Sequence, residues 1–291
     1  MRHLQPRPEL LVEPQWLAGR LNDPSVHVID CTVHMIPQPV GASIVNSGRP
    51  DYLAGHIPGA HYLHTIGDLS DPQGSFAYTL PSVDHISALL RRLGIGNEDT
   101  VVLYGRALPQ VVTRAWWVLT VSGVENVRIL NGGWQGWVAS GLPTSQEAPR
   151  PAAGDFRGHR VASMIATSAD VQEALRQDDV CILNALSPEQ FAGTGGAHYG
   201  RPGRIPRSVN LPNRNLVDPA TGRYRSLSEI SAMFERQGVL DRDRVITYCG
   251  GGIAASGTSF ALAMLGHDNV ALYDGSLLEW SADPALPLVV D

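Results

Sequence analysis

Two stretches of the sequence repeat each other: Gly123-Val-Glu-Asn-Val-Arg-Ile-Leu-Asn-Gly-Gly-Trp-Gln-Gly-Trp137 and Gly266-His-Asp-Asn-Val-Ala-Leu-Tyr-Asp-Gly-Ser-Leu-Leu-Glu-Trp280. Their glycine, Asn-Val pair and final tryptophan stay in step at an offset of 143 residues. Three shorter matches precede them in the same order: Tyr104-Gly105 with Tyr248-Cys249, Gly55-His-Ile-Pro-Gly59 with Gly203-Arg-Ile-Pro-Arg207, and Val28-Ile-Asp30 with Ile182-Leu-Asn184. Because chance does not supply four matches in one order, the sequence predicts two homologous halves.

Each half alternates short β-branched runs with helical patterns. Strands are expected near 26–29, 101–104 and 127–130, and a helix over 85–93. Such alternation predicts an α/β fold, in which helices cover both faces of a small parallel sheet. Residues 141–154 are rich in Pro, Ala and polar residues without a period, which is typical of a linker. We therefore expect one domain over 1–142, a linker over 143–162 and a second domain over 163–291.

Composition excludes several classes of protein. With 43% apolar and 17% charged residues, the chain is typical of soluble globular proteins, and its net charge of −6 argues against nucleic acid as a partner. No apolar run suggests a secretory signal or a membrane span. All 22 Lys+Arg residues are arginine, which excludes lysine-based Schiff-base, pyridoxal phosphate and P-loop chemistry. Three scattered cysteines fit a reducing cytoplasm, with no metal site and no cofactor expected.

One cysteine stands where chemistry is expected. Cys249 follows the β-branched run Val245-Ile-Thr-Tyr248 and opens Cys249-Gly-Gly-Gly-Ile-Ala254, ahead of a helical pattern. At such a strand end, successive backbone N–H groups and a helix N-terminus favour negative charge, and so lower the pKa of a thiol. The alternative is a buried structural cysteine beside a loop.

These residues carry a resemblance. The chain resembles the tandem-domain rhodanese family of sulfurtransferases over about 11–288. The resemblance rests on His56-Ile-Pro-Gly-Ala60 and its partner 203–207, on Tyr248 with the six-residue loop 249–254, and on the paired Asn131-Gly-Gly-Trp134 and Asp274-Gly-Ser276 ends. It implies that only the second domain is catalytic, since Gly105 occupies the cysteine position of the first. The first domain is then one wall of an inter-domain cleft. A six-residue loop implies sulfur chemistry, because family members with one more residue accommodate phosphate or arsenate.

The resemblance implies a covalent mechanism. Cys249 would take the outer sulfur of a donor and become a persulfide, which splits the transfer into two easier steps. The persulfide anion would be stabilised by the backbone N–H groups of Gly250, Gly251, Gly252, Ile253 and Ala254. The expected partners are a small-molecule sulfur donor, thiosulfate or a related compound, and an acceptor such as cyanide or a thiol. A thioredoxin-like dithiol protein is a further candidate acceptor.

Donor identity stays open in the sequence. Family members that use thiosulfate commonly have cations in the loop, and those that use 3-mercaptopyruvate have Gly-Ser or Gly-Thr after the cysteine, whereas Gly251 offers neither. A 3-mercaptopyruvate sulfurtransferase is therefore the alternative enzyme. A phosphatase or arsenate reductase is disfavoured by loop length and by the lack of an arginine in the loop. A non-catalytic rhodanese-like module that binds sulfur or regulates would predict a lost cysteine, yet Cys249 is present.

Candidate donor-binding residues come from one arginine-rich segment. In place of the aspartate and arginine common in relatives, the sequence has Asn184-Ala-Leu186, and four arginines lie within 14 residues. Guanidinium groups suit carboxylates and sulfonates, so Arg201 and Arg204 are expected to bind substrate, ahead of Arg207 and Arg214. His56 is a further candidate, although a structural role in the His-Ile-Pro-Gly turn is the favoured interpretation.

Other prominent residues are expected to be structural. Five tryptophans, Trp116, Trp117, Trp134, Trp137 and Trp280, are predicted to anchor the core or the domain interface. Cys31 and Cys181 are predicted to pack as small hydrophobic residues. Asp274 and Glu279 follow the last strand and could face the inter-domain cleft, but helix or turn capping is the favoured interpretation.

Overall fold

The computed structural model describes residues 4–106 and 108–291 and contains two five-stranded parallel sheets. The strand order of the first sheet is β1 (Leu11–Val12), β7 (Asn126–Leu130), β6 (Thr100–Tyr104), β2 (Val26–Asp30), β5 (His61–Tyr62). The order of the second is β8 (Ile165–Ala166), β12 (Val270–Tyr273), β11 (Arg244–Tyr248), β9 (Val180–Asn184), β10 (Val209–Asn210). The two orders match strand for strand, which confirms the predicted α/β fold of two homologous halves.

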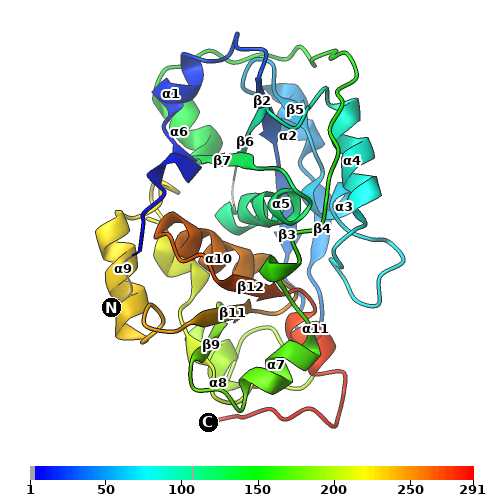
Figure 1. Cartoon of the computed structure of the whole chain (residues 1–291). Coiled ribbons are helices and arrows are strands. Elements are labelled where there is room, and N and C mark those ends of the chain that lie inside the picture. Colours follow the sequence, from blue (N-terminus) through cyan, green and yellow to red (C-terminus); the bar gives the residue numbers. More distant parts are fainter. Residues whose placement is uncertain (1–3, 107) are drawn as a thin grey trace.

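Helices cover both faces of each sheet, as Figure 1 shows. Those of the first half are α1 (Pro14–Ala18), α2 (Arg49–Ala54), α3 (Thr65–Asp68), α4 (Val83–Arg92), α5 (Pro109–Val121) and α6 (Gly133–Ala139). Those of the second half are α7 (Ser168–Ala174), α8 (Pro188–Ala192), α9 (Leu227–Arg236), α10 (Ile253–Met264) and α11 (Ser276–Trp280). Short 3-10 helices occupy Pro8–Leu10, Ala162–Met164 and Asn213–Leu216.

Local sequence explains the elements. The central strands are continuous apolar, β-branched runs because both of their faces are buried, as in β6 and β11. Several helices begin at a hydroxyl residue: the Ser82 side chain accepts the N–H of His85 at the start of α4, and Ser226 does the same for Glu229 at α9. The Glu229 carboxylate in turn accepts the Ser226 N–H, which completes a capping box.

The two halves meet through α5 and α10, which lie side by side at the centre of the molecule (Figure 1). Trp116 of α5 packs edge-on against Phe260 of α10, with ring centroids 5.0 Å apart. The hydroxyls of Thr113 and Ser256, 143 residues apart, hydrogen-bond to each other at 2.9 Å. Because these residues are equivalent in the repeat, the contact marks an approximate twofold axis between the halves.

The same axis relates a second pair of contacts. After β7, the Asn131 Oδ1 accepts the N–H of Tyr224 from the other half at 3.0 Å. After β12, the Asp274 Oδ2 accepts the N–H of Leu80 from the first half at 2.7 Å. The first half thus binds the segment that precedes α9, and the second half binds the segment that precedes α4. These two equivalent hydrogen bonds both connect the halves.

The expected linker is fixed to the first half. Residues 146–161 contain no helix or strand, in agreement with the composition of this segment. However, the backbone of Ser145 pairs with that of His56, Phe156 is fully buried, and the Val161 N–H reaches the Val121 carbonyl at 2.9 Å. The segment packs against the first domain along its length and is not a flexible linker.

A two-stranded hairpin distinguishes the first half. Strands β3 (Val33–Ile36) and β4 (Ile44–Ser47) are antiparallel. The turn between them reaches the second half, where the Gly41 N–H donates to the His198 carbonyl at 2.7 Å and the His198 N–H to the Pro39 carbonyl at 2.9 Å. The hairpin thus connects the two domains.

The tryptophan and cysteine predictions are largely confirmed. Trp116, Trp117, Trp137 and Trp280 are buried, while Trp134 is half-buried beneath the guanidinium of Arg106, 4.1 Å from its ring centroid. Cys31 and Cys181 are buried free thiols. Burial raises the pKa of Cys181 to about 11 and raises that of Cys31 as well, so both remain protonated at neutral pH.

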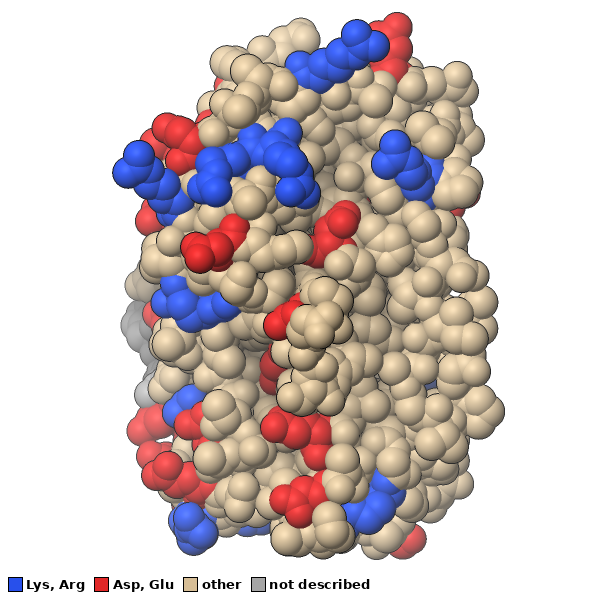
Figure 2. Space-filling view, turned by 90° about the vertical axis from the view of Figure 1, so that its right-hand side faces the viewer, with Lys and Arg blue, Asp and Glu red and all other residues tan. Residues whose placement is uncertain are grey.

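Figure 2 shows one face of the molecule, on which acidic and basic side chains are scattered among neutral ones. A row of acidic side chains runs down the middle of this face, in keeping with the net charge of −6. Within the described residues, no helix is both long and apolar enough to cross a membrane.

Candidate active site

The Cys249 loop, residues 249–252, connects β11 to α10 at the carboxyl end of the second sheet. Cys249 is 2% exposed. The Cys249 and Gly250 carbonyls accept the N–H groups of Leu277 and Leu278 from α11, at 3.1 and 2.8 Å. Because two consecutive carbonyls point toward α11, the loop has a fixed curvature.

Ser276 supports the backbone of Cys249. Its hydroxyl accepts the Cys249 N–H at 3.1 Å and donates to the Tyr273 carbonyl at 2.8 Å. Ser276 is fully buried and has a φ of +49°, a left-handed conformation that favours glycine. In the first half the equivalent residue is Gly133, with φ +53°. A serine in this strained conformation is a specific addition to the second half.

Close neighbours leave little room for a side chain at two glycines of the loop. A Cβ on Gly250 would lie 2.0 Å from Cζ of Tyr199, and one on Gly251 would lie 2.8 Å from Leu278 Cδ1. Among the described residues, no acceptor bonds to the N–H groups of Gly250, Gly251 or Gly252. The sequence assigned these groups to a cradle for a sulfur anion, and in the structure they are free to take that role.

A cavity of about 490 Å³ lies over Cys249 and is lined by both halves. We call it the Cys249 cavity. Tyr78 comes from the first half and Tyr199 from the second. Burial, and then the nearby charge of Cys249, raises the pKa of Tyr199 to about 12, and burial raises the pKa of Tyr78. Both phenols therefore stay protonated at neutral pH, and the cavity wall beside the cysteine is uncharged.

Of the four arginines in the predicted binding segment, Arg214 alone lines the Cys249 cavity. It is exposed and forms no ion pair with any described residue. Arg201 instead donates to the carbonyls of Ser281, Asp283 and Leu286 at 3.0, 2.7 and 2.8 Å. Arg204 pairs with Asp291 at 2.7 Å, and Arg207 pairs with Asp178 on the surface. The two arginines ranked first from sequence thus lie outside the cavity.

His56 also lies away from the Cys249 cavity. It is fully buried and stacked on Tyr52, with ring centroids 3.9 Å apart. Its Nδ1 contacts the Tyr52 carbonyl at 2.8 Å, and its Nε2 contacts the Glu147 carbonyl at 3.1 Å. This position agrees with the favoured interpretation, a histidine that holds the turn.

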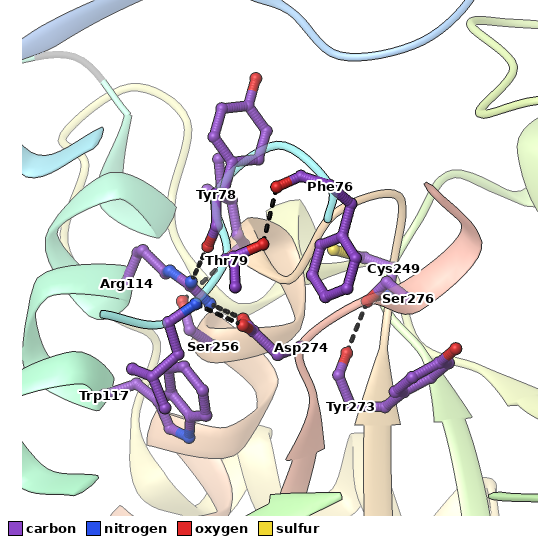
Figure 3. A network of polar contacts seen from close by, with 12 residues as sticks. Phe76, Tyr78, Thr79, Arg114, Trp117, Cys249, Ser256, Tyr273, Asp274 and Ser276 are labelled. Carbon is purple, nitrogen blue, oxygen red and sulfur yellow. Dashed lines mark hydrogen bonds and ion pairs between the residues drawn. The ribbon is translucent and has the colours of Figure 1, made fainter. Parts of the chain in front are cut away.

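A buried ion pair that the sequence interpretation missed lies beside the Cys249 loop. Arg114 of α5 is 1% exposed, and its Nη1 lies 2.6 Å from Asp274 Oδ1 across the domain interface. The same guanidinium donates to the Tyr78 carbonyl, as Figure 3 shows. Asp274 is therefore an inter-domain partner, and the capping role expected for it is wrong.

The ion pair holds the segment 78–81 of the first half over the loop. Arg114 and Asp274 bind the Tyr78 carbonyl and the Leu80 N–H, and Arg160 binds the Pro81 carbonyl at 2.6 Å. Arg114 Nη1 lies 2.9 Å from the place of a Cβ on Gly252. The first half thus contributes a cation directly beneath a loop that has none of its own.

No group of three or more His, Cys, Asp or Glu within the described residues is placed to hold a metal ion. The groups that the site offers include one thiol, free backbone N–H groups, neutral phenols and the Arg214 guanidinium.

Comparison with known proteins agrees with this architecture. The model of the rhodanese-like domain matches residues 13–140 and again 167–283. The 3-mercaptopyruvate sulfurtransferase of Escherichia coli (strain K12) is 32% identical over 95% of this chain and 96% of its own. The thiosulfate sulfurtransferase YnjE of the same organism is 31% identical over 97% of this chain and 66% of its own.

Solved structures give the same result. The crystal structure of SseA from Escherichia coli, described as a 3-mercaptopyruvate sulfotransferase with the rhodanese fold, superimposes with a TM-score of 0.78 at 30% identity. The superposition covers 92% of this chain and 98% of SseA. The chain therefore belongs to the tandem-domain rhodanese family of sulfurtransferases.

Proposed function

We propose that this sulfurtransferase moves the outer sulfur of thiosulfate to a thiophilic acceptor through a persulfide on Cys249. In the first step the Cys249 thiolate attacks the outer sulfur, the S–S bond of thiosulfate breaks, and sulfite leaves with the electron pair. In the second step a thiolate or cyanide attacks the outer sulfur of the persulfide and regenerates the Cys249 thiolate. The free N–H groups of Gly250, Gly251 and Gly252 support the anionic persulfide between these steps.

The lack of a proton donor in the Cys249 loop favours thiosulfate as the donor. Sulfite leaves as an anion and needs no proton. Pyruvate, in contrast, leaves 3-mercaptopyruvate as an enolate, which must take up a proton at carbon. Gly251 has no hydroxyl to assist that step, and the space of a side chain there is occupied by Leu278 and Tyr78, 2.8 and 3.1 Å from the place of a Cβ. The proton would have to come from another group of the cavity, such as the phenols of Tyr78 and Tyr199.

Arg214 is the proposed contact for the donor anion. It lines the Cys249 cavity and is exposed. A hydrogen bond from Ser187 and, to a smaller extent, the charge of Arg214 lower the pKa of Glu189, but Arg214 forms no close ion pair with any described residue. Arginine suits the oxygens of thiosulfate and those of a carboxylate equally. The cation therefore explains anion binding but does not choose between donors.

A 3-mercaptopyruvate sulfurtransferase is the second candidate, since relatives at 32% identity carry that name. The two donors give different products, so sulfite release from thiosulfate is compared with pyruvate release from 3-mercaptopyruvate. We expect the higher kcat/KM with thiosulfate and loss of both reactions in Cys249→Ser. Cys181→Ser, which changes a buried thiol far from the loop in sequence, is the matched control and should retain activity.

Mass spectrometry of the intact protein tests the covalent step. Exposure to thiosulfate should add one sulfur, roughly 32 Da, to wild type and Cys181→Ser but not to Cys249→Ser. Turnover by Cys249→Ser would refute the assignment.

The first domain is proposed to be catalytically silent, because Gly105 stands where the second has Cys249. The acceptor is proposed to be cyanide or a small thiol, since a nucleophile that is 2% exposed is reached most easily by a small molecule. A relative at 30% identity is named sulfur carrier protein TtuD, so a protein that presents a thiol on an extended segment is an acceptor to assay next. The cytoplasmic location stays a prediction.

A further inference from the structure

The first half contains a cavity at the position where it lacks a nucleophile. This space of about 510 Å³ surrounds Gly105 and is as large as the Cys249 cavity. We call it the Gly105 cavity. It is closed by residues 219–224 of the second half, just as Tyr78 of the first half covers the Cys249 loop. The cavity has thus been kept although the cysteine has not.

Two guanidinium groups line the Gly105 cavity, and the Glu13 carboxylate, which does not line it, pairs with one of them. Arg106 from the first half and Arg223 from the second line it, and none of the lining residues that the structure describes is acidic. Both side chains are held in place: Arg106 donates to the Asp51 carbonyl at 2.9 Å, and Arg223 pairs with Glu13 at 2.5 Å. Arg106 Nε is buried and has no partner. Two fixed guanidinium groups from opposite domains are suited to one anion.

The remaining wall is uncharged and consists largely of apolar side chains and exposed backbone. Glycines at 105, 132, 133 and 136 expose main-chain atoms. Apolar side chains form much of the rest of the lining: Leu108, Pro109, Val112, Ile129, Leu130, Pro219. Gln135, Ser140, Thr221 and Tyr224 add uncharged polar groups. At Gly133, with φ +53°, a Cβ would lie 2.4 Å from the Gly105 carbonyl oxygen, so the floor stays bare. This combination fits a small organic anion with a carboxylate or sulfonate at one end and an apolar body at the other.

The Gly105 and Cys249 cavities are separated by the first turn of α5. Leu108 lines both, while Pro109 faces the Gly105 cavity and Gln110 the Cys249 cavity. The Gln110 carbonyl also accepts a hydrogen bond from Ser256 of α10 at 3.4 Å. An occupant of the Gly105 cavity would therefore touch the turn that forms a wall of the Cys249 cavity.

We propose that the Gly105 cavity is a second ligand site, which binds a small organic anion and alters sulfur transfer through the first turn of α5. The ligand bridges the two domains by contacting Arg106 and Arg223. Binding does not depend on the identity of the sulfur donor, so this site and the proposed function are tested separately.

Calorimetric titration of the full-length protein with benzoate tests the site, with neutral benzamide as the isosteric probe. We expect benzoate to bind, benzamide to bind at least tenfold more weakly, and Arg223→Gln to lower benzoate affinity about tenfold or more, because one charge-assisted contact is lost. Arg214→Gln, which removes the cation of the Cys249 cavity, is the matched control and should leave benzoate affinity unchanged. Ala139→Trp, at an exposed position of the lining, should block binding without disturbing the core.

Steady-state kinetics test the coupling. Saturating benzoate should change kcat for sulfite release at least twofold in wild type and leave kcat of Arg223→Gln unchanged. Without benzoate, the two proteins should have the same kcat. Equal binding of benzoate and benzamide, or an affinity that depends on Arg214 and not on Arg223, would overturn the site. Benzoate binding that leaves kcat of the wild type unaltered would overturn the coupling.

Discussion

Replacing Arg114 by methionine should destabilise the protein far more than a surface arginine does. Arg114 is 1% exposed, and its loss leaves the Asp274 carboxylate, itself 10% exposed, without its cation. Breaking a buried pair in this way costs about 3–5 kcal/mol. At about 2 °C or more per kcal/mol for a chain of this size, the melting temperature should fall by roughly 6 °C or more.

The matched control is Arg207→Met. Arg207 also pairs with an aspartate, Asp178, but the two side chains are 46% and 94% exposed. Exposed pairs contribute about 0–1 kcal/mol, so the melting temperature should change by no more than about 2–3 °C. Circular dichroism of both variants at one protein concentration makes the comparison.

A second substitution should recover part of the loss. In the first half Asn131 accepts the Tyr224 N–H through a neutral amide, and the residue equivalent to Arg114 is Gly257. Asp274→Asn in the Arg114→Met protein copies that arrangement, because an amide oxygen still accepts the Leu80 N–H and no buried charge is left over. The double variant should therefore melt higher than Arg114→Met alone.

Kinetics complete this test. Arg114 binds the Tyr78 carbonyl, so Arg114→Met should lower kcat for sulfite release as the segment 78–81 loosens. Equal melting of Arg114→Met and Arg207→Met, or a double variant less stable than Arg114→Met, would refute the reasoning.

Three further results are expected. Gly250→Ala should abolish sulfite release, because its Cβ would meet Tyr199 at 2.0 Å, and Tyr199→Ala should partly rescue it. Gly19→Ala, whose Cβ would lie 3.7 Å from the Gln15 carbonyl oxygen, should leave activity unchanged. Arg214→Gln should raise the KM for thiosulfate about tenfold with kcat within twofold, since an anion contact is lost and the loop is intact. Burial lowers the pKa of His61 to about 4, below the roughly 6.5 of an unfolded chain, so its contribution to stability is complete above pH 6.5 and is lost as the pH falls toward 4. The urea midpoint should therefore fall less between pH 7 and 4.5 in His61→Gln than in wild type, and an equal fall would contradict this.

The repeat explains why so much of the fold could be predicted. It predicted two sheets of one design, and the strand-glycine-helix pattern predicted the position of Cys249. The strands and helices of each half, and the loop at Cys249, are local features that depend on residues adjacent in the sequence. The strand orders of the two sheets agree with the repeat throughout.

The arginines show where sequence reasoning ends. Four arginines close together in the sequence point in different directions. Three of the side chains bind the carbonyls and carboxylates that surround them in the folded structure, and these come from distant parts of the sequence. Arg201 is taken up by three carbonyls near the C-terminus, a contact that no spacing predicts. Arg214, ranked low from sequence, is the one of the four that reaches the Cys249 cavity.

Two residues that the sequence interpretation missed left signals in the sequence. Arg114 is a charge within the apolar helical run Val111-Val-Thr-Arg-Ala-Trp-Trp117, and a buried charge needs a partner. Ser276 replaces a glycine of the repeat, Gly133, at a position with positive φ. Comparing the two halves position by position would have indicated both.

The contact between Thr113 and Ser256 on the twofold axis has a consequence for how the protein aggregates. If the halves separate, and the contacts of residues 146–161 with the first half break as well, each half exposes the surface that fits the other half of a second molecule, and the released segment can span between them. Partly opened chains at high concentration should then exchange halves and form a swapped dimer. Because each Cys249 cavity needs one first half and one second half from any source, that dimer would keep two complete sites, so aggregation by this route would leave activity per chain intact.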